Sequence, residues 1–304
     1  MNNLKKIGLT ALGTTLIASS AFAADFSVTG NASISMDQTD DKQGTAIYMG
    51  DSLNFKANGE MDNGVTVAVA YEIDGGALDD HSITFGFAGN GNLRFGGHGD
   101  GTSLSSMDDK TPNAYEESWD IVKGKPTVIN GDSGNNSFKY TSESMGGAVA
   151  TLAYVHDANY VDFGLTVKPE SFDGLTVGYA RGDTETRNAA VQVESTESTL
   201  YATYVIGSIT VGYQMSELDS PTAGSSLDSV AMGISYAVTD NFSFAYNTHE
   251  VEKENNSQDQ KASGISASYT QGSMTLGGGK NKVENMNNAA GDVSGYEMTL
   301  SFAF

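Results

Sequence analysis

Six carboxylates crowd into the first part of one polar stretch of the chain, residues 99–134. They are Asp100, Asp108, Asp109, Glu116, Glu117 and Asp120, and the only tryptophan, Trp119, lies among them. Such a group raises the local concentration of cations, and carboxylate oxygens suit Ca²⁺ as ligands. The ligand spacing of an EF-hand is absent, so we expect no defined metal site, and loosely bound Ca²⁺ is the most that these residues indicate.

Histidine is the other residue type that could do chemistry here. The chain has four histidines, at His81, His98, His156 and His249. Neither the zinc-binding pattern H-E-x-x-H nor the nucleophile pattern G-x-S-x-G is present. The sequence therefore predicts no catalytic residues and no cofactor, and an enzyme remains only as an alternative from a different class.

The chain is strongly acidic. Its 38 Asp and Glu residues outnumber its 16 Lys and Arg residues, which gives a net charge of −22 over 304 residues. Acidic residues also gather in the polar segments 37–41 and 250–259. A surface of this kind attracts cations and repels polyanions, so nucleic acid is excluded as a partner.

The N-terminus has the pattern of a secretory signal peptide. Lys5 and Lys6 precede an apolar run over 7–16, and Ala21-Phe22-Ala23 matches the A-x-A cleavage site. We expect residues 1–23 to be removed, and the loss of Lys5 and Lys6 takes the net charge from −22 to −24. No later segment approaches the roughly 18 apolar residues of a transmembrane helix. Because the exported chain has no cysteine, its stability must come from hydrogen bonds and burial.

Apolar residues fall on every second position almost throughout residues 24–304. The last segment shows the pattern most clearly, with Tyr296, Met298, Leu300, Phe302 and Phe304 alternating with polar or small residues. Period-two alternation is typical of β-strands with one apolar and one polar face. Counting the alternating segments gives about sixteen strands, an even number of the kind that bacterial outer-membrane barrels use.

The connections between these strands are of two kinds. Short turns are expected at 62–64, 89–92, 142–147, 169–174, 207–208, 239–241 and 270–272. Longer polar connections are expected at 37–46, 74–80, 99–134, 183–197, 217–228, 250–261 and 283–292, with a short exception at 156–159. Short turns at one end and long loops at the other are typical of a membrane-spanning antiparallel barrel. We therefore predict an all-β fold in which residues 24–304 form one transmembrane β-barrel domain.

Several longer motifs resemble a known family. They are "FGGHGD" (95–100), "NSFKYTSESMGG" (136–147), "GLTVGYARGD" (174–183) and the terminal Phe304. Together they resemble Gram-negative general porins, and most closely the alphaproteobacterial, Rhodobacter-type branch. The resemblance implies a homotrimeric, water-filled channel for small hydrophilic solutes in the outer membrane, in contact with its lipid and lipopolysaccharide. It also implies that loop 99–134 folds into the pore.

The resemblance gives the charged residues a role. By strand register, Lys56, Arg94 and Lys139 lie on the polar face that would line the lumen. Carboxylates on an infolded loop opposite these basic side chains would constrict the pore and set up a transverse field. The alternative is that the acidic loop is simply solvated outside the membrane. The excess of acidic residues predicts a preference for cations, and the scarcity of basic residues favours a general pore over one specific for a sugar or an organic acid.

The C-terminal strand carries the last expectation. Tyr296, Phe302 and Phe304 resemble the terminal signal that barrel-assembly machinery reads, and this strand would close the barrel against the first. An adhesin or structural anchor is a third possibility, although no separate soluble domain is visible in the sequence.

Overall fold

The computed structural model describes residues 25–40, 44–99, 101–122, 128–129, 131, 135–188 and 191–304. The expected signal peptide, residues 1–23, lies outside the described residues. Among the helices of the described part, none is long and apolar enough to cross a membrane.

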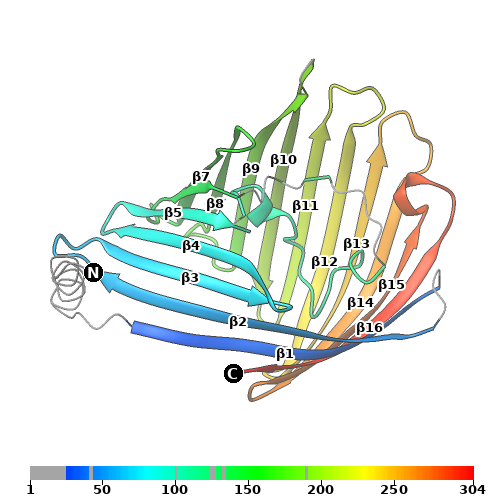
Figure 1. The fold of residues 1–304 in the computed structure, drawn as a ribbon. Coiled ribbons are helices and arrows are strands. Elements are labelled where there is room, and N and C mark those ends of the chain that lie inside the picture. Colours follow the sequence, from blue (N-terminus) through cyan, green and yellow to red (C-terminus); the bar gives the residue numbers. More distant parts are fainter. Residues whose placement is uncertain are drawn as a thin grey trace, which may run out of the picture.

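Sixteen antiparallel strands form a closed barrel, in which each strand bonds to the strands before and after it in the sequence (Figure 1). The strands are β1 (Asp25–Thr39), β2 (Ala46–Glu60), β3 (Thr66–Asp74), β4 (Ala77–Phe87), β5 (Gly91–His98), β6 (Ser137–Thr141), β7 (Ala148–Val155), β8 (Tyr160–Val167), β9 (Leu175–Asn188), β10 (Val191–Ile206), β11 (Ile209–Asp219), β12 (Leu227–Thr239), β13 (Phe242–Lys253), β14 (Gln260–Gln271), β15 (Met274–Glu284) and β16 (Val293–Ala303). Among the described residues, two short 3₁₀ helices, η1 (Ser105–Met107) and η2 (Met286–Asn288), lie in connections. The predicted fold class is confirmed.

The last strand closes the barrel against the first. β16 pairs with β1 from Asn31↔Ala303 to Thr39↔Gly295. Beyond the strand, Phe304 still exchanges two backbone hydrogen bonds with Gly30, at 2.8 and 2.9 Å. A side chain at Gly30 would come within 2.9 Å of the Phe304 ring, so the small residue makes room for the terminal aromatic. The closed sheet therefore has no free edge strand, and the C-terminus is held in place.

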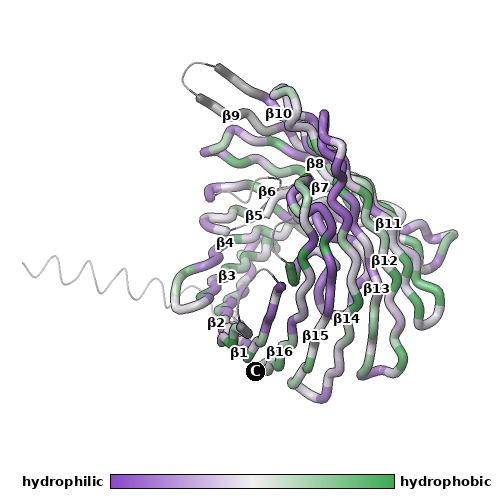
Figure 2. Tube along the Cα trace, turned by 90° about the vertical axis from the view of Figure 1, so that its right-hand side faces the viewer, coloured by the Kyte–Doolittle hydropathy of each residue, from purple (hydrophilic) through white to green (hydrophobic). Residues whose placement is uncertain are grey.

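Hydrophobic and hydrophilic residues alternate along the strands (Figure 2). On β16, Tyr296, Met298 and Phe302 are exposed on the outer wall, and Phe304 is 69% exposed. Between them Glu297 and Thr299 point inward and bond to a side chain of the interior. An outer wall with so many exposed large apolar side chains is what lipid contact requires.

Two of the predicted long connections are wrong. β3 and β4 pair as far as Asp74↔Ala77, so only Gly75 and Gly76 link them, both with positive φ as a tight hairpin turn demands. β9 and β10 pair as far as Asn188↔Val191, so most of segment 183–197 is strand. Polar composition predicts a loop in these segments, yet strand residues that extend beyond the bilayer need no apolar face. The short connection at 156–159 is confirmed, because β7 ends at Val155 and β8 begins at Tyr160.

Candidate functional site

The connection between β5 and β6 enters the barrel and follows its inner wall (Figure 1). One anchor near its start is Asp162 on β8, which is only 1% exposed. The Asp162 carboxylate accepts hydrogen bonds from the backbone N–H groups of Ser103 (3.1 Å) and Leu104 (2.8 Å), and from the Tyr160 hydroxyl (3.2 Å). A carboxylate that accepts several N–H bonds in a buried place holds its donors strongly. The start of the loop is therefore fixed to β8.

Further polar side chains of the wall hold the loop along its length. Gln214 on β11 accepts a bond from the Lys110 N–H (2.8 Å) and donates to the carbonyl of Met107 (2.7 Å). On β15, Asn281 donates to the Ser118 carbonyl at 2.7 Å. These bonds satisfy backbone groups that would otherwise be buried without partners, which is the condition for irregular chain inside a barrel.

The loop also lies very close to the backbone of the wall. Ser118 of the loop fills the space beside Gly264 on β14 that a side chain would need. The Cα of Ser118 lies 3.1 Å from the point that a Cβ on Gly264 would occupy. A Cβ on Gly279 of β15 would lie 2.9 Å from a methyl carbon of Ile121 in the loop. Gly277 on β15 likewise faces the ring of Tyr115. Glycine at these inward positions lets the loop pack directly against the strands.

The tryptophan of the acidic stretch is a packing residue. Trp119 is 3% exposed and lies in an apolar cluster with Ala231, Ala262 and Val283 of the wall. Its ring centroid is 4.3 Å from that of His249 on β13. This cluster fixes the far end of the loop against β12–β15, so the position of the neighbouring carboxylates is set by apolar burial.

Three of the predicted site carboxylates lie together. Carboxylate oxygens of Asp109, Glu117 and Asp120 are all within 4.8 Å of one another. Glu117 is 9% exposed, and its burial, followed by a hydrogen bond with Asp120 and the charge of Asp109, raises its pKa to about 8. The Asn113 amide donates to Glu117. Close carboxylates of this kind share protons, so at neutral pH the cluster carries less than its full formal charge.

The remaining acidic residues have different surroundings. Asp108, together with Asp109, lines a small cavity between the loop and the wall, against Gln214 and Ser216. Glu116 is partly exposed. Asp100 lies outside the described residues.

The three predicted basic residues lie on a different sector of the barrel. Arg94 on β5 and Lys139 on β6 are direct register partners, and the Lys139 ammonium donates to the carbonyl of Gly101 at 2.6 Å. Lys56 on β2 shares its face of the strand with Ser52 and is exposed. These residues therefore line β2–β6, and Lys139 also holds the start of the loop, whereas the other loop anchors lie on β8 and on later strands.

Sequence reasoning missed the wall residues that anchor the loop. Besides the anchors above, Glu197 on β10 accepts the Gly131 N–H at 2.9 Å, and Glu297 on β16 accepts the Tyr115 hydroxyl. Each stands in the inward, polar register, which the alternation pattern does predict. Nothing in the sequence distinguishes these residues from other inward polar side chains, because their partners are distant in the chain.

Comparison with known proteins identifies the family of this barrel. The family of Gram-negative porins matches residues 8–288. By sequence, the chain matches no curated protein.

Solved structures are similar in fold. OmpT of Vibrio cholerae superimposes with a TM-score of 0.72 at 14% identity, over 94% of this chain and 99% of that one. An anion-selective porin from Comamonas acidovorans gives a TM-score of 0.70 at 13% identity, over 92% of this chain and all (100%) of that one. A variant of the Rh. blastica porin gives 0.65 at 15% identity, over 92% and 100%. With a closed barrel of sixteen strands, an inward-folded loop and a family match over nearly its whole length, this chain belongs to the Gram-negative porins of the outer membrane.

Proposed function

We propose that the protein forms a water-filled channel for passive diffusion of small hydrophilic solutes and ions, with a preference for cations. The observation that carries this proposal is loop segment 101–122, which is anchored inside a closed barrel by Asp162, Gln214 and Asn281. A loop held there narrows the lumen, and its carboxylates bring negative charge into the barrel. In this proposal the channel has no catalytic activity.

The charge distribution supports cation preference. The chain has 38 acidic and 16 basic residues, and the loop brings a group of carboxylates into the barrel. Lys56, Arg94 and Lys139 on the facing sector supply the opposite charge, so that polar solutes experience a transverse field between the two sectors. The Comamonas relative is named anion-selective. At 13% identity its likeness extends to the fold alone, so selectivity has to come from the charges of this chain.

Assembly and surroundings are part of the same proposal. OmpT of Vibrio cholerae has been described in a trimer form, and we infer a homotrimer for this chain also. We place the protein in the alphaproteobacterial branch on the motifs described above. Tyr296, Phe302 and Phe304 would serve as the signal for barrel-assembly machinery, and lipopolysaccharide would surround the outer rim, with loosely bound Ca²⁺ bridging its phosphates to loop carboxylates.

Reconstitution into planar bilayers tests the proposal. Open-channel current steps are expected, and in a KCl gradient the zero-current potential should have the sign of cation selectivity. Absence of steps from correctly folded protein would refute a channel. Steps with an anion-selective potential would mean that the basic sector dominates the narrowest section.

A further inference from the structure

An apolar groove of about 370 Å³ lies on the outer wall of the barrel, across β13–β16. Its apolar lining comes from side chains that all stand in the outward register. They are Phe242, Ala267, Tyr269, Leu276, Tyr296 and Met298. This volume falls within the range of small-molecule sites, about 300–1,000 Å³. Unlike such sites, the groove opens toward lipid, because it faces away from the lumen.

A missing side chain creates the groove. Gly278 occupies the outward position between Leu276 and Lys280, and a Cβ there would lie 2.9 Å from the carbonyl oxygen of Glu297. The flanking glycines of β15 face the opposite way, against loop residues of the interior. The hollow in the outer wall is therefore specified by the backbone and does not depend on a flexible side chain.

A lysine stands directly above the groove. Lys280 follows Gly278 by two residues on the same face of β15, about 7 Å along the strand. Its neighbours across the sheet are Tyr296 on β16 and Ile265 on β14. β15 runs from its short turn toward the longer connection before β16, so Lys280 lies nearer the end that faces the cell exterior. A tyrosine and a lysine side by side are typical of the level of lipid headgroups.

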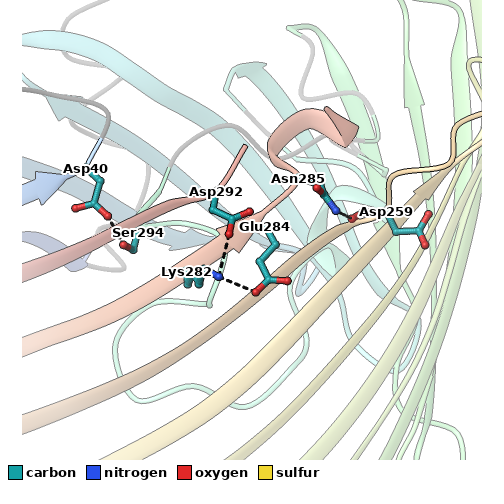
Figure 3. Close-up of polar contacts among 7 residues, drawn as sticks. All are labelled: Asp40, Asp259, Lys282, Glu284, Asn285, Asp292 and Ser294. Carbon is teal, nitrogen blue, oxygen red and sulfur yellow. Dashed lines mark hydrogen bonds and ion pairs between the residues drawn. The ribbon is translucent and has the colours of Figure 1, made fainter. Parts of the chain in front are cut away.

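Among the described residues, Lys280 makes no ion pair, whereas the basic residues nearby are neutralised by protein carboxylates. Lys282 pairs with Glu284 at 2.7 Å and with Asp292 at 3.0 Å (Figure 3). Lys261 on β14 pairs with Glu250 at 2.5 Å. Lys280 is thus the cation of this patch that is left for a ligand.

We propose that the groove and Lys280 together bind one phosphorylated glycolipid of the outer leaflet, a lipopolysaccharide molecule. An acyl chain fills the apolar groove beside Gly278, and a phosphate of the sugar headgroup accepts hydrogen bonds from the Lys280 ammonium. The groove and the lipid are complementary at two depths of the membrane. The apolar surface of the groove lies at the depth of the acyl chains, and the unpaired positive charge of Lys280 lies at the depth of the phosphates, in a protein that is otherwise strongly acidic.

Titration of the full-length protein in detergent with purified lipid A, followed by native mass spectrometry, tests the proposal. In Lys280→Gln, lipid A binding should weaken about tenfold to a hundredfold, the usual value of one hydrogen bond to a charged group. Ala267→Phe should block the groove and weaken binding similarly. The matched controls Lys168→Gln, at the other end of the barrel, and Ala202→Phe, on the outer face of β10, should bind as the wild type does.

Two further ligands identify which part of the lipid is recognised. Dephosphorylated lipid A should bind the wild type as weakly as intact lipid A binds Lys280→Gln, and inorganic phosphate alone should not bind measurably. The proposal is overturned if Lys280→Gln keeps wild-type affinity, or if both forms of lipid A bind equally. It is also overturned if Ala267→Phe changes only the oligomeric state, because the occupant would then be a second copy of the chain. Single-channel conductance should stay unchanged in all these variants, so a failure here leaves the channel proposal intact.

Discussion

Replacing Asp162 with alanine should release the first part of the pore loop while leaving the barrel intact. The carboxylate accepts the N–H groups of Ser103 and Leu104 at 3.1 and 2.8 Å in a place where it is 1% exposed. A hydrogen bond to a charged group contributes about 1.5–3 kcal/mol, so two such bonds set an upper range of about 3–6 kcal/mol. Water entering from the lumen can solvate the freed N–H groups. We therefore expect the docked segment to lose about 3 kcal/mol of stability, which shifts the equilibrium roughly a hundredfold toward the undocked segment.

Hydrogen exchange of the purified protein measures this shift directly. Protection of the Ser103 and Leu104 amides should fall about a hundredfold in Asp162→Ala, and open-channel current noise should increase as the segment fluctuates. Asp183→Ala is the matched control, because the Asp183 carboxylate accepts a hydrogen bond from Thr196 of β10 and pairs with Arg181 of β9, and neither partner belongs to the loop. Unchanged exchange at the two loop amides in Asp162→Ala would show that apolar packing of Leu104 alone holds this segment, and the reasoning from the carboxylate would be wrong.

Three other changes give separate outcomes. Because the pKa of Glu117 is about 8, its charge appears between roughly pH 7 and 9, and cation selectivity measured by zero-current potential should rise over that interval but stay flat in Glu117→Gln. Gly277→Val would push a side chain into the Tyr115 ring, so single-channel conductance should change, whereas Gly59→Val, which meets open space, should leave it unaltered. Deleting Phe304 should lower the yield of assembled protein in cells more than the stability of barrels already folded, measured by heat-modified migration in gels; equal losses would contradict a role in recognition.

The architecture of the barrel could be predicted because a single physical rule acts on every strand. Each residue of a membrane-spanning strand meets either lipid or lumen, so the alternation in Tyr296–Phe304 and its equivalents gives the register without any tertiary information. Where strands leave the bilayer the rule no longer applies. The polar β9–β10 extension up to Asn188 and Val191 therefore has the sequence pattern of a loop, although it is strand.

The pore loop could be predicted only in outline. Its entry into the barrel followed from resemblance to a family, while its path depends on partners such as Asp162, Gln214 and Asn281, which have no local sequence signal. The close grouping of Asp109, Glu117 and Asp120 has no signal in the sequence either, because it depends on how the loop folds around the buried Trp119.

The anchors of the loop have a consequence for the order of biogenesis. The loop leaves the sheet after β5, yet Tyr115 meets Glu297 across 182 residues of sequence, Ser118 meets Asn281 across 163, and Ala114 meets Ser266 across 152. Contacts of such high contact order form late, since the chain between them must be in place first. An incomplete barrel lacking β14–β16 keeps the anchors Asp162 and Gln214 but has no surface on which residues 114–118 can dock. The width of the pore is therefore set in the final step of assembly. A chain whose synthesis or insertion stops early does not form the channel narrowed by the loop.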